Sequence, residues 1–205
     1  MKTLKHPFLK INGTAYGGNQ AWFTRKFMKK VGCGVIGATN LLIHLQKKEE
    51  MTEQEYVAFA EHLWLHYLPV VPRFGMNGLT LMFGLNRYFR KQGIPYKAFW
   101  GLSGKKMFQR IDTMLGKNLP VILAVGPNFP NIFGKRTLKF YKKSNTGAYV
   151  TATKTKAHYV TVTGRDGIYL QISSWGEEYY IDIREYREYV KNYSCPLVSN
   201  IICIK

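Results

Sequence analysis

The sequence predicts an α+β fold, with a Cys-bearing helix in its N-terminal half and an antiparallel sheet in its C-terminal half. Apolar residues recur at helical spacing as far as Gly116, and from Leu119 onward they alternate or form the short apolar runs typical of strands. Helices that precede an antiparallel sheet are typical of α+β proteins. The 205 residues suit a single domain, with a helical half over about 14–116 and a sheet half over about 117–205.

The composition is that of a globular protein. Hydrophobic residues make up 46% of the chain and aromatic residues 15%, which excludes general disorder. No stretch approaches the roughly 20 apolar residues that a membrane span requires, and residues 1–10 lack the apolar block of a signal peptide. We therefore expect a cytoplasmic protein, although a leader removed beforehand would leave no trace in this sequence.

The chain is strongly basic, with 30 Lys and Arg against 12 Asp and Glu and a net charge of +18. Such a charge creates a positive field that attracts anions. Nucleic acid, an anionic cell-wall polymer, a membrane surface and an acidic peptide all fit as partners. The basic residues are spread along the whole chain, which equally fits a role in solubility.

The first helix predicted by periodicity starts close to Cys33, after a glycine-rich loop over 14–23. Its small residues, Gly34, Gly37 and Ala38, form a side on which another element can pack closely, so we expect this helix in the middle of the domain. A thiol at a helix N-terminus faces unpaired N–H groups and the positive end of the helix dipole, and both favour the thiolate. The alternative is that Cys33 is simply a small buried hydrophobic residue.

Three helices are predicted next. A capping box at 52–55 starts the second helix, which keeps its apolar spacing until Pro69. The third helix spans about 77–92 with Gly93 as its stop, and a strand over 94–100 follows. Ser103 is a good N-cap for the fourth helix, which ends at Gly116.

Sheet strands account for most of the remaining chain. Strands are predicted over 119–125, 137–143, 157–163, 168–174, 178–183 and 197–204, with a proline-containing loop over 128–134 and a short helix over 184–191.

Other cysteines and histidines favour structural roles. Cys195 and Cys203 bring the number of cysteines to three, without metal-ligand spacing or a disulfide framework. His62 and His66 are spaced i, i+4, which can bind a metal, but no acidic or cysteine partner is placed to complete such a site. We expect no metal and no cofactor, and we interpret His44 as a packed residue.

The strands on either side of Arg165-Asp166-Gly167 form a predicted hairpin. A two-residue loop at 165–166 places His158 opposite Ser173, whereas a loop at 166–167 places it opposite Trp175. Side chains repeat every two residues along a strand. In both registers His158 therefore shares a face with Ser173 and Trp175.

These features together resemble the papain-like cysteine peptidases, most closely the short bacterial bacteriocin-leader (double-glycine) group. The resemblance covers about residues 14–190 and depends on the order of three motifs, which are Cys33 at a helix start, Ala157-His158-Tyr159-Val160 at a strand start, and Ser173-Ser174-Trp175-Gly176 after the next strand. It implies that Cys33 is the nucleophile and His158 the general base.

Further site residues follow from the same resemblance. Gln20 matches the amide of the oxyanion hole, together with the backbone N–H of Cys33. In papain the glutamine lies about six residues before the cysteine, where this chain has Phe27, so Gln20 requires a longer loop and Asn19 is the fallback. Trp175 would shield the histidine from water, and the residues expected to contact substrate are Asn19, Trp22, Gly32 and Trp175.

The position that orients the histidine departs from the family pattern. The family has Asn or Asp there, and the matching residue is Ser173. A serine hydroxyl can hold the imidazole tautomer but supplies no charge, so turnover would be slow unless another residue serves. The nearest carboxylates in sequence are those of Asp166, Glu177 and Asp182.

Three hypotheses result. The first is a cysteine peptidase or amide hydrolase that acts on a peptide or amide substrate, with an acidic one favoured by the basic surface. The second is a weakly active or inactive papain-like scaffold that binds a polyanion such as nucleic acid or a cell-wall polymer. The third, a redox sensor based on Cys33, has the least support.

Overall fold

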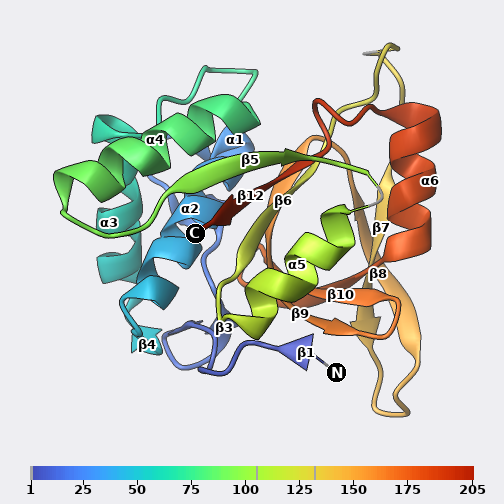
Figure 1. Ribbon diagram of the computed structural model, residues 1–205, viewed down its shortest axis with the longest axis horizontal. Coiled ribbons are helices and arrows are strands. Elements are labelled where there is room, and N and C mark those ends of the chain that lie inside the picture. Colours follow the sequence, from blue (N-terminus) through green and yellow to red (C-terminus); the bar gives the residue numbers. More distant parts are fainter. Residues whose placement is uncertain (1, 105, 132) are drawn as a thin grey trace.

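A computed structural model describes residues 2–104, 106–131 and 133–205, and it shows helices packed beside one large sheet (Figure 1). The strand order is β5-β12-β6-β9-β10-β11-β7-β8, with β1 on β9, and every pairing in this sheet is antiparallel. The predicted α+β class is confirmed. The strands of this sheet are β1 (Lys2–Thr3), β5 (Ala98–Leu102), β6 (Val121–Val125), β7 (Leu138–Lys143), β8 (Tyr149–Thr155), β9 (His158–Asp166), β10 (Tyr169–Ser174), β11 (Glu177–Asp182) and β12 (Asn200–Ile204).

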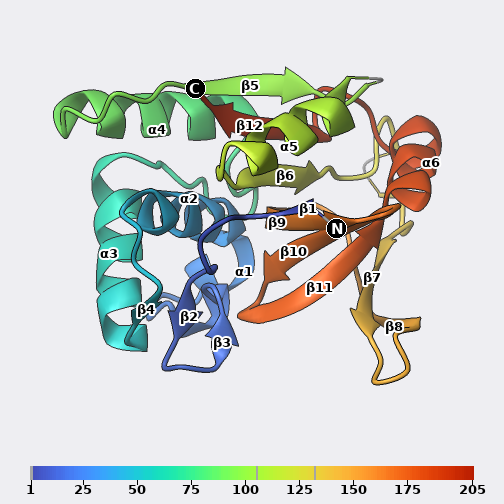
Figure 2. The ribbon, with the colours of Figure 1, turned by 60° about the horizontal axis from the view of Figure 1, so that its bottom comes forward.

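A second, small sheet lies below α2 (Cys33–Leu45) in the view of Figure 2. It contains β2 (Lys10–Ile11), β3 (Ala15–Tyr16) and β4 (Glu50–Met51), in the order β3-β2-β4. The helices are a 3₁₀ turn η1 (Gln20–Trp22), α1 (Met28–Val31), α2 (Cys33–Leu45), α3 (Glu53–His66), α4 (Gly78–Lys91), α5 (Met107–Gly116) and α6 (Ile183–Tyr193). Among the described residues, none of these helices is both long and apolar enough to cross a membrane.

Helix α2 lies between the large sheet and two other helices. It packs on β9 and β6 on one side and on α3 and α4 on the other. Every residue from Gly34 to His44 is buried, and Cys33 at its start is partly exposed. A Cβ added at Gly37 would lie 3.1 Å from Ile122 Cγ2 on β6. The small residues therefore let the helix approach the sheet closely, as the sequence predicts.

The helix starts agree with prediction in two cases and differ in one. The Thr52–Glu55 capping box opens α3, and Asn77 caps α4 with its side chain. Ser103, in contrast, does not cap α5, because a turn in which Met107 N donates to Gly104 O (3.1 Å) separates it from the helix. The prediction for Ser103 was wrong.

The strand predicted over 94–100 begins later, at Ala98. Pro95 has no N–H to donate to a strand ladder, and the backbone pairing starts where Lys97 and Lys205 exchange two hydrogen bonds (2.8 and 3.0 Å), directly before Ala98 faces Ile204. Asn86 of α4 holds this start, since its Oδ1 accepts from Ala98 N (2.7 Å) and its Nδ2 donates to Ala98 O (2.9 Å). The helical half thus contributes one strand, β5, to the large sheet.

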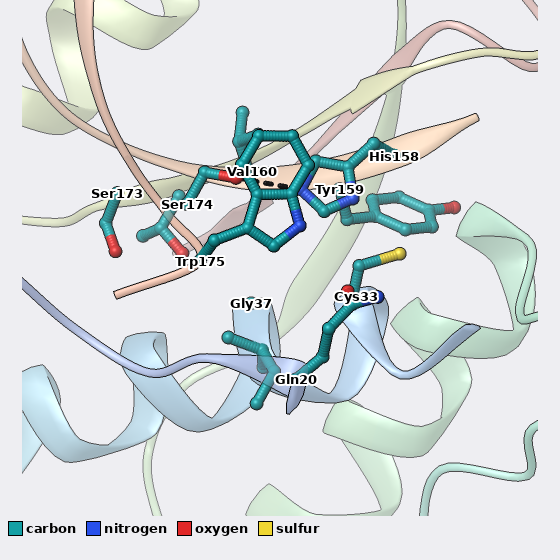
Figure 3. A pocket seen from close by; sticks show the side chains of 11 residues that line it. Gln20, Cys33, Gly37, His158, Tyr159, Val160, Ser173, Ser174 and Trp175 are labelled. Atoms are coloured by element: carbon teal, nitrogen blue, oxygen red, sulfur yellow. Dashed lines mark hydrogen bonds between the residues drawn. The ribbon is translucent and has the colours of Figure 1, made fainter. Parts of the chain in front are cut away.

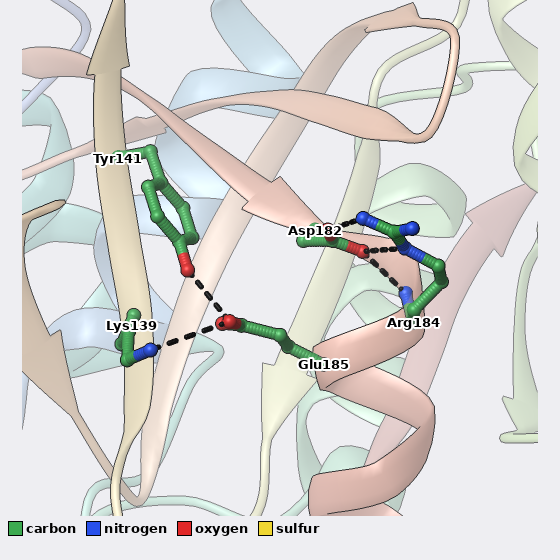
Figure 4. A network of polar contacts seen from close by, with 5 residues as sticks. All are labelled: Lys139, Tyr141, Asp182, Arg184 and Glu185. Atoms are coloured by element: carbon green, nitrogen blue, oxygen red, sulfur yellow. Dashed lines mark hydrogen bonds and ion pairs between the residues drawn. The ribbon is translucent and has the colours of Figure 1, made fainter. Parts of the chain in front are cut away.

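Polar contacts attach α6 to β7 at the other end of the sheet (Figure 4). Tyr141 Oη donates to Glu185 (2.7 Å), and Lys139 Nζ lies 3.4 Å from the same carboxylate. Asp182 caps α6 through Arg184 N (2.7 Å) and pairs with the Arg184 guanidinium. The predicted short helix over 184–191 is present and slightly longer.

Candidate active site

Cys33 and His158, which are distant in sequence, line the same small pocket at the contact between α2 and the large sheet (Figure 3). The free space in it is about 10 Å³, room for about one water molecule. The lining residues are Gln20, Cys33, Ile36, Gly37, His158, Tyr159, Val160, Thr161, Ser173, Ser174 and Trp175. The fold therefore brings together the thiol and the imidazole that the sequence analysis selected.

The imidazole of His158 is fixed on two sides. His158 is the first residue of β9 and is buried, its Nε2 lies 2.8 Å from Ser174 Oγ, and its ring stacks on the Trp175 indole with centroids 4.4 Å apart and planes 17° apart. Burial lowers the pKa of His158 to about 4, so the ring is neutral at pH 7. With Nε2 engaged by Ser174, Nδ1 is the nitrogen left for a reacting group.

Two residues next to the stacked rings have a left-handed backbone. Ala157, directly before His158, has φ of 51°, and Trp175 also has φ of 51°. Residues other than glycine and asparagine rarely adopt this region, at a cost of about 1–3 kcal/mol each. Lys47 and Arg73, which do not line the pocket, adopt it as well.

The thiol of Cys33 is neutral in this arrangement. Burial raises its pKa above the ordinary value, although the backbone N–H groups of Tyr159, Gly34 and Cys33 itself act in the opposite direction. Among the hydrogen bonds of the described residues, none joins Cys33 Sγ to the His158 ring, whose Nε2 contacts Ser174 instead. The pair therefore rests as thiol and imidazole and not as an ion pair.

The hairpin register differs from both predicted registers. Tyr169 pairs with Asp166 across a Gly167–Ile168 loop, and a β-bulge between Gln171 and Ile172 then shifts the pairing by one residue. Gly167 at the first loop position is a signal for such a turn, and Gly164 beside the bulge is a weaker signal for the shift. As a result Ser174, and not the predicted Ser173, lies on the His158 face of the sheet.

Ser173 belongs to a buried polar network behind the pocket. Its Oγ donates to Tyr16 O (2.7 Å) and accepts from Asn40 Nδ2 (3.4 Å), which also donates to Thr161 Oγ1 (3.2 Å). Oδ1 of Asn40 accepts from Gly18 N (3.0 Å) and Tyr56 Oη (2.8 Å). The network joins α2, α3 and the sheet to the chain just before Gln20.

Asn40 and Tyr56 were not predicted as residues of the site. The only signal is an amide in the middle of an otherwise apolar helix, and a buried amide must find partners. Which partners it finds depends on the tertiary structure.

The residues predicted to form the oxyanion hole or to contact the substrate are each held by different contacts. Gln20 lines the pocket, and its Nε2 donates to Lys29 O (2.8 Å). Asn19 caps η1, with Oδ1 accepting from Ala21 N (2.9 Å), so its amide is engaged locally. Trp22 packs edge-on against Tyr56 with centroids 6.0 Å apart. Gly32 is buried directly before Cys33, where a Cβ would lie 2.6 Å from Met28 O.

The carboxylates considered as partners of His158 are engaged elsewhere. Asp166 accepts from Tyr149 Oη (2.7 Å) and Lys143 Nζ (3.1 Å). Glu177 pairs with Lys142, and Asp182 caps α6.

The remaining histidines and cysteines lie outside the pocket. His44 is buried, and its Nε2 lies 3.0 Å from Asn118 O, as expected for a packed residue. His62 and His66 have ring centroids 4.6 Å apart on the exposed side of α3, and within the described ranges no three His, Cys, Asp or Glu side chains are grouped as for a metal. Cys203 is buried and Cys195 partly exposed.

Comparison with known proteins adds evidence on the fold. No protein-family model matches the chain, and no curated protein matches it. A similar solved structure is that of a protein from Bacillus anthracis described as a "putative C39-like peptidase", with 14% identity and a TM-score of 0.53 over 100% of this chain and 98% of that chain. Together with the topology, this similarity shows that the chain has a papain-like cysteine peptidase fold of the C39 kind.

Proposed function

We propose that this protein is a cysteine peptidase or amide hydrolase in which Cys33 is the nucleophile and His158 the general base. The observation that carries the proposal is the shared pocket of these two residues, one at a helix start and the other at a strand start. A nucleophile beside a base that is oriented by a third group is the arrangement that covalent acyl transfer requires. Ser174 is the third group.

The neutral resting state fits proton transfer during the attack. As Cys33 Sγ bonds to the amide carbon, its proton moves to Nδ1 of His158, while Nε2–H donates to Ser174 Oγ. The carbonyl oxygen becomes an oxyanion, for which the donors are the Cys33 N–H and the second N–H of the Gln20 amide, whose first N–H donates to Lys29 O. The imidazolium then protonates the leaving nitrogen, and water releases the acyl group by the reverse transfer.

Alkylation with iodoacetamide tests this pair without a known substrate. Iodoacetamide reacts with the thiolate, and burial raises the pKa of Cys33, so the informative comparison is between proteins with and without the base. The rate at Cys33 should fall at least about tenfold in His158→Ala, with the partly exposed Cys195 as an unchanged internal standard. No effect of His158→Ala would overturn the proposal.

The second candidate is a papain-like scaffold without turnover that binds a polyanion. It is favoured by the net charge of +18 and by a serine hydroxyl in place of a carboxylate at His158. Tight binding of single-stranded DNA that weakens steeply with salt and is unchanged in Cys33→Ala, in a protein whose Cys33 alkylates slowly, would favour this candidate over the first.

A further inference from the structure

We infer that the substrate carries acidic residues close to the cleaved bond and that four cations beside Cys33 recognise them. We call Arg25, Lys26, Lys29 and Lys30 the basic segment. This inference rests on the proposed function and names the substrate class of the same site.

The basic segment leads directly into the nucleophile. Lys29 and Lys30 lie on α1, three to four residues before Cys33. The bond from Gly32 N to Met28 O (2.8 Å) is the last of α1, and α2 starts at the next residue, Cys33. The carbonyl of Lys29 accepts from the pocket residue Gln20. The two lysines are therefore within four residues of the nucleophile along the chain, and one of them contacts a pocket residue through its backbone.

The positive charge of this segment is largely uncompensated. All four side chains belong to exposed residues, and the sequence has no acidic residue before Glu49. In the described part of the chain, every ion pair uses an acid between Asp112 and Glu185. One carboxylate lies next to the basic segment: Glu61 accepts a hydrogen bond from Oγ1 of Thr24 (3.0 Å), the residue directly before Arg25. Four cations against one acid leave a net positive surface.

This placement favours an acidic peptide over a long polyanion. Screening at physiological salt limits the field of an exposed charge to about 8–10 Å, so the lysines act on groups bound at the pocket and little beyond it. A peptide with its scissile bond at Cys33 has its neighbouring side chains within that distance. Asp or Glu side chains there gain from the field, whereas Lys or Arg are disfavoured.

The field at Cys33 can be measured with two alkylating reagents that differ in charge. Iodoacetate is an anion and iodoacetamide is neutral, and both react with the thiolate, so the ratio of their rates cancels any change in thiol pKa. In Lys29→Glu/Lys30→Glu we expect the iodoacetate to iodoacetamide ratio at Cys33 to fall about three- to tenfold at low salt. In 1 M salt this difference should largely disappear.

The matched control is Lys47→Glu/Lys48→Glu, which makes the same charge change at the far end of α2, about 20 Å from Cys33 at 1.5 Å per residue. In this control, the iodoacetate to iodoacetamide rate ratio at Cys33 should stay within about twofold of its value in the unchanged protein. A ratio unchanged in Lys29→Glu/Lys30→Glu, or equally changed in the control, would overturn the inference.

A peptide library then separates the inference from the proposed function. Cleaved peptides should be enriched in Asp and Glu next to the scissile bond, and the enrichment should be lost in Lys29→Glu/Lys30→Glu. Cleavage without acidic enrichment would overturn the inference and leave the proposed function intact. No cleavage at all, with a normal rate ratio, would overturn the proposed function and the substrate class with it. Protection of Cys33 by single-stranded DNA but not by acidic peptides would also overturn the inference.

Discussion

A hydroxyl group holds the imidazole of His158, where papain-like peptidases use Asn or Asp. Ser174 Oγ lies 2.8 Å from Nε2 and can accept a hydrogen bond from the Nε2–H group, which fixes the tautomer with Nδ1 free for the thiol. A neutral hydroxyl does not offset the desolvation of the imidazolium, which is consistent with the pKa of about 4 at this buried site. The site therefore favours a base that accepts a proton only during the attack.

Replacing Ser174 by alanine tests this role. We expect Ser174→Ala to slow alkylation of Cys33 by iodoacetamide up to about tenfold, because the imidazole loses the hydrogen bond that orients it, worth about 0.5–1.5 kcal/mol. Ser173→Ala is the matched control, since Ser173 contacts Tyr16 O and Asn40 and not His158. The control should alkylate at nearly the normal rate but lose about 1–3 kcal/mol of unfolding free energy. The reverse pattern would assign the orienting role to Ser173.

Among the elements, α2 and the segment over 16–22 are joined by Asn40. Its amide accepts from Gly18 N and Tyr56 Oη and donates to Thr161 and Ser173. Asn40→Ala leaves several buried polar groups unpaired, so we expect a loss of about 2–4 kcal/mol in urea unfolding. We also expect faster amide hydrogen exchange over 16–22, where Gln20 resides.

Asn86→Ala is the control for this element. Asn86 also makes two hydrogen bonds, which are partly buried and go to the backbone of Ala98 on β5. Asn86→Ala should destabilise the protein without changing amide hydrogen exchange over 16–22. Equal exchange in both variants over that segment would show that Asn40 contributes to general stability only.

The spacing of apolar residues along the chain made many of the helices and strands predictable. The helices at Cys33, after Thr52 and after Asn77 have clear apolar spacing and form as predicted, and the last two are capped by the Thr52 and Asn77 side chains. Strand β8 escaped prediction because Tyr149–Thr155 is mostly exposed and has no apolar face to alternate. Its position depends on pairing with β7, which is a tertiary property.

The site was predictable in its chemistry and less so in its register. Cys33 and His158 were selectable because helix and strand starts have sequence signals. The choice between Ser173 and Ser174 depends on one β-bulge, and a one-residue shift moves every side chain to the other face of a strand. The local mark of that bulge is Gly164, since a glycine inside a strand often accompanies a bulge, and the two predicted registers did not take it into account.

For the whole molecule, the buried neutral His158 predicts acid lability. Its folded pKa of about 4 lies below the unfolded value of about 6.5, so the unfolded chain binds the proton more readily. Stability is full above about pH 6.5 and falls as the pH drops toward 4, by about 3 kcal/mol from this residue. Burial also lowers the pKa of His44, which adds a loss of the same sign.

Urea unfolding at pH 7 and pH 4 measures this loss. The starting protein should lose about 3 kcal/mol more than His158→Gln between these two values, since glutamine does not titrate. His44→Gln should remove the part of the stability loss that comes from His44 and leave the contribution of His158 in place. An identical loss in the starting protein and His158→Gln would contradict a buried neutral imidazole at this site.

The contact between Trp175 and His158 has an optical consequence. Indole emission is quenched by a charged imidazolium in van der Waals contact much more than by a neutral imidazole, and these two rings stack almost in parallel. The molecule thus carries a built-in fluorophore at the position where the catalytic proton is proposed to arrive. Once the emission of the other three tryptophans is subtracted, its brightness reports the charge of the base without any added dye or substrate.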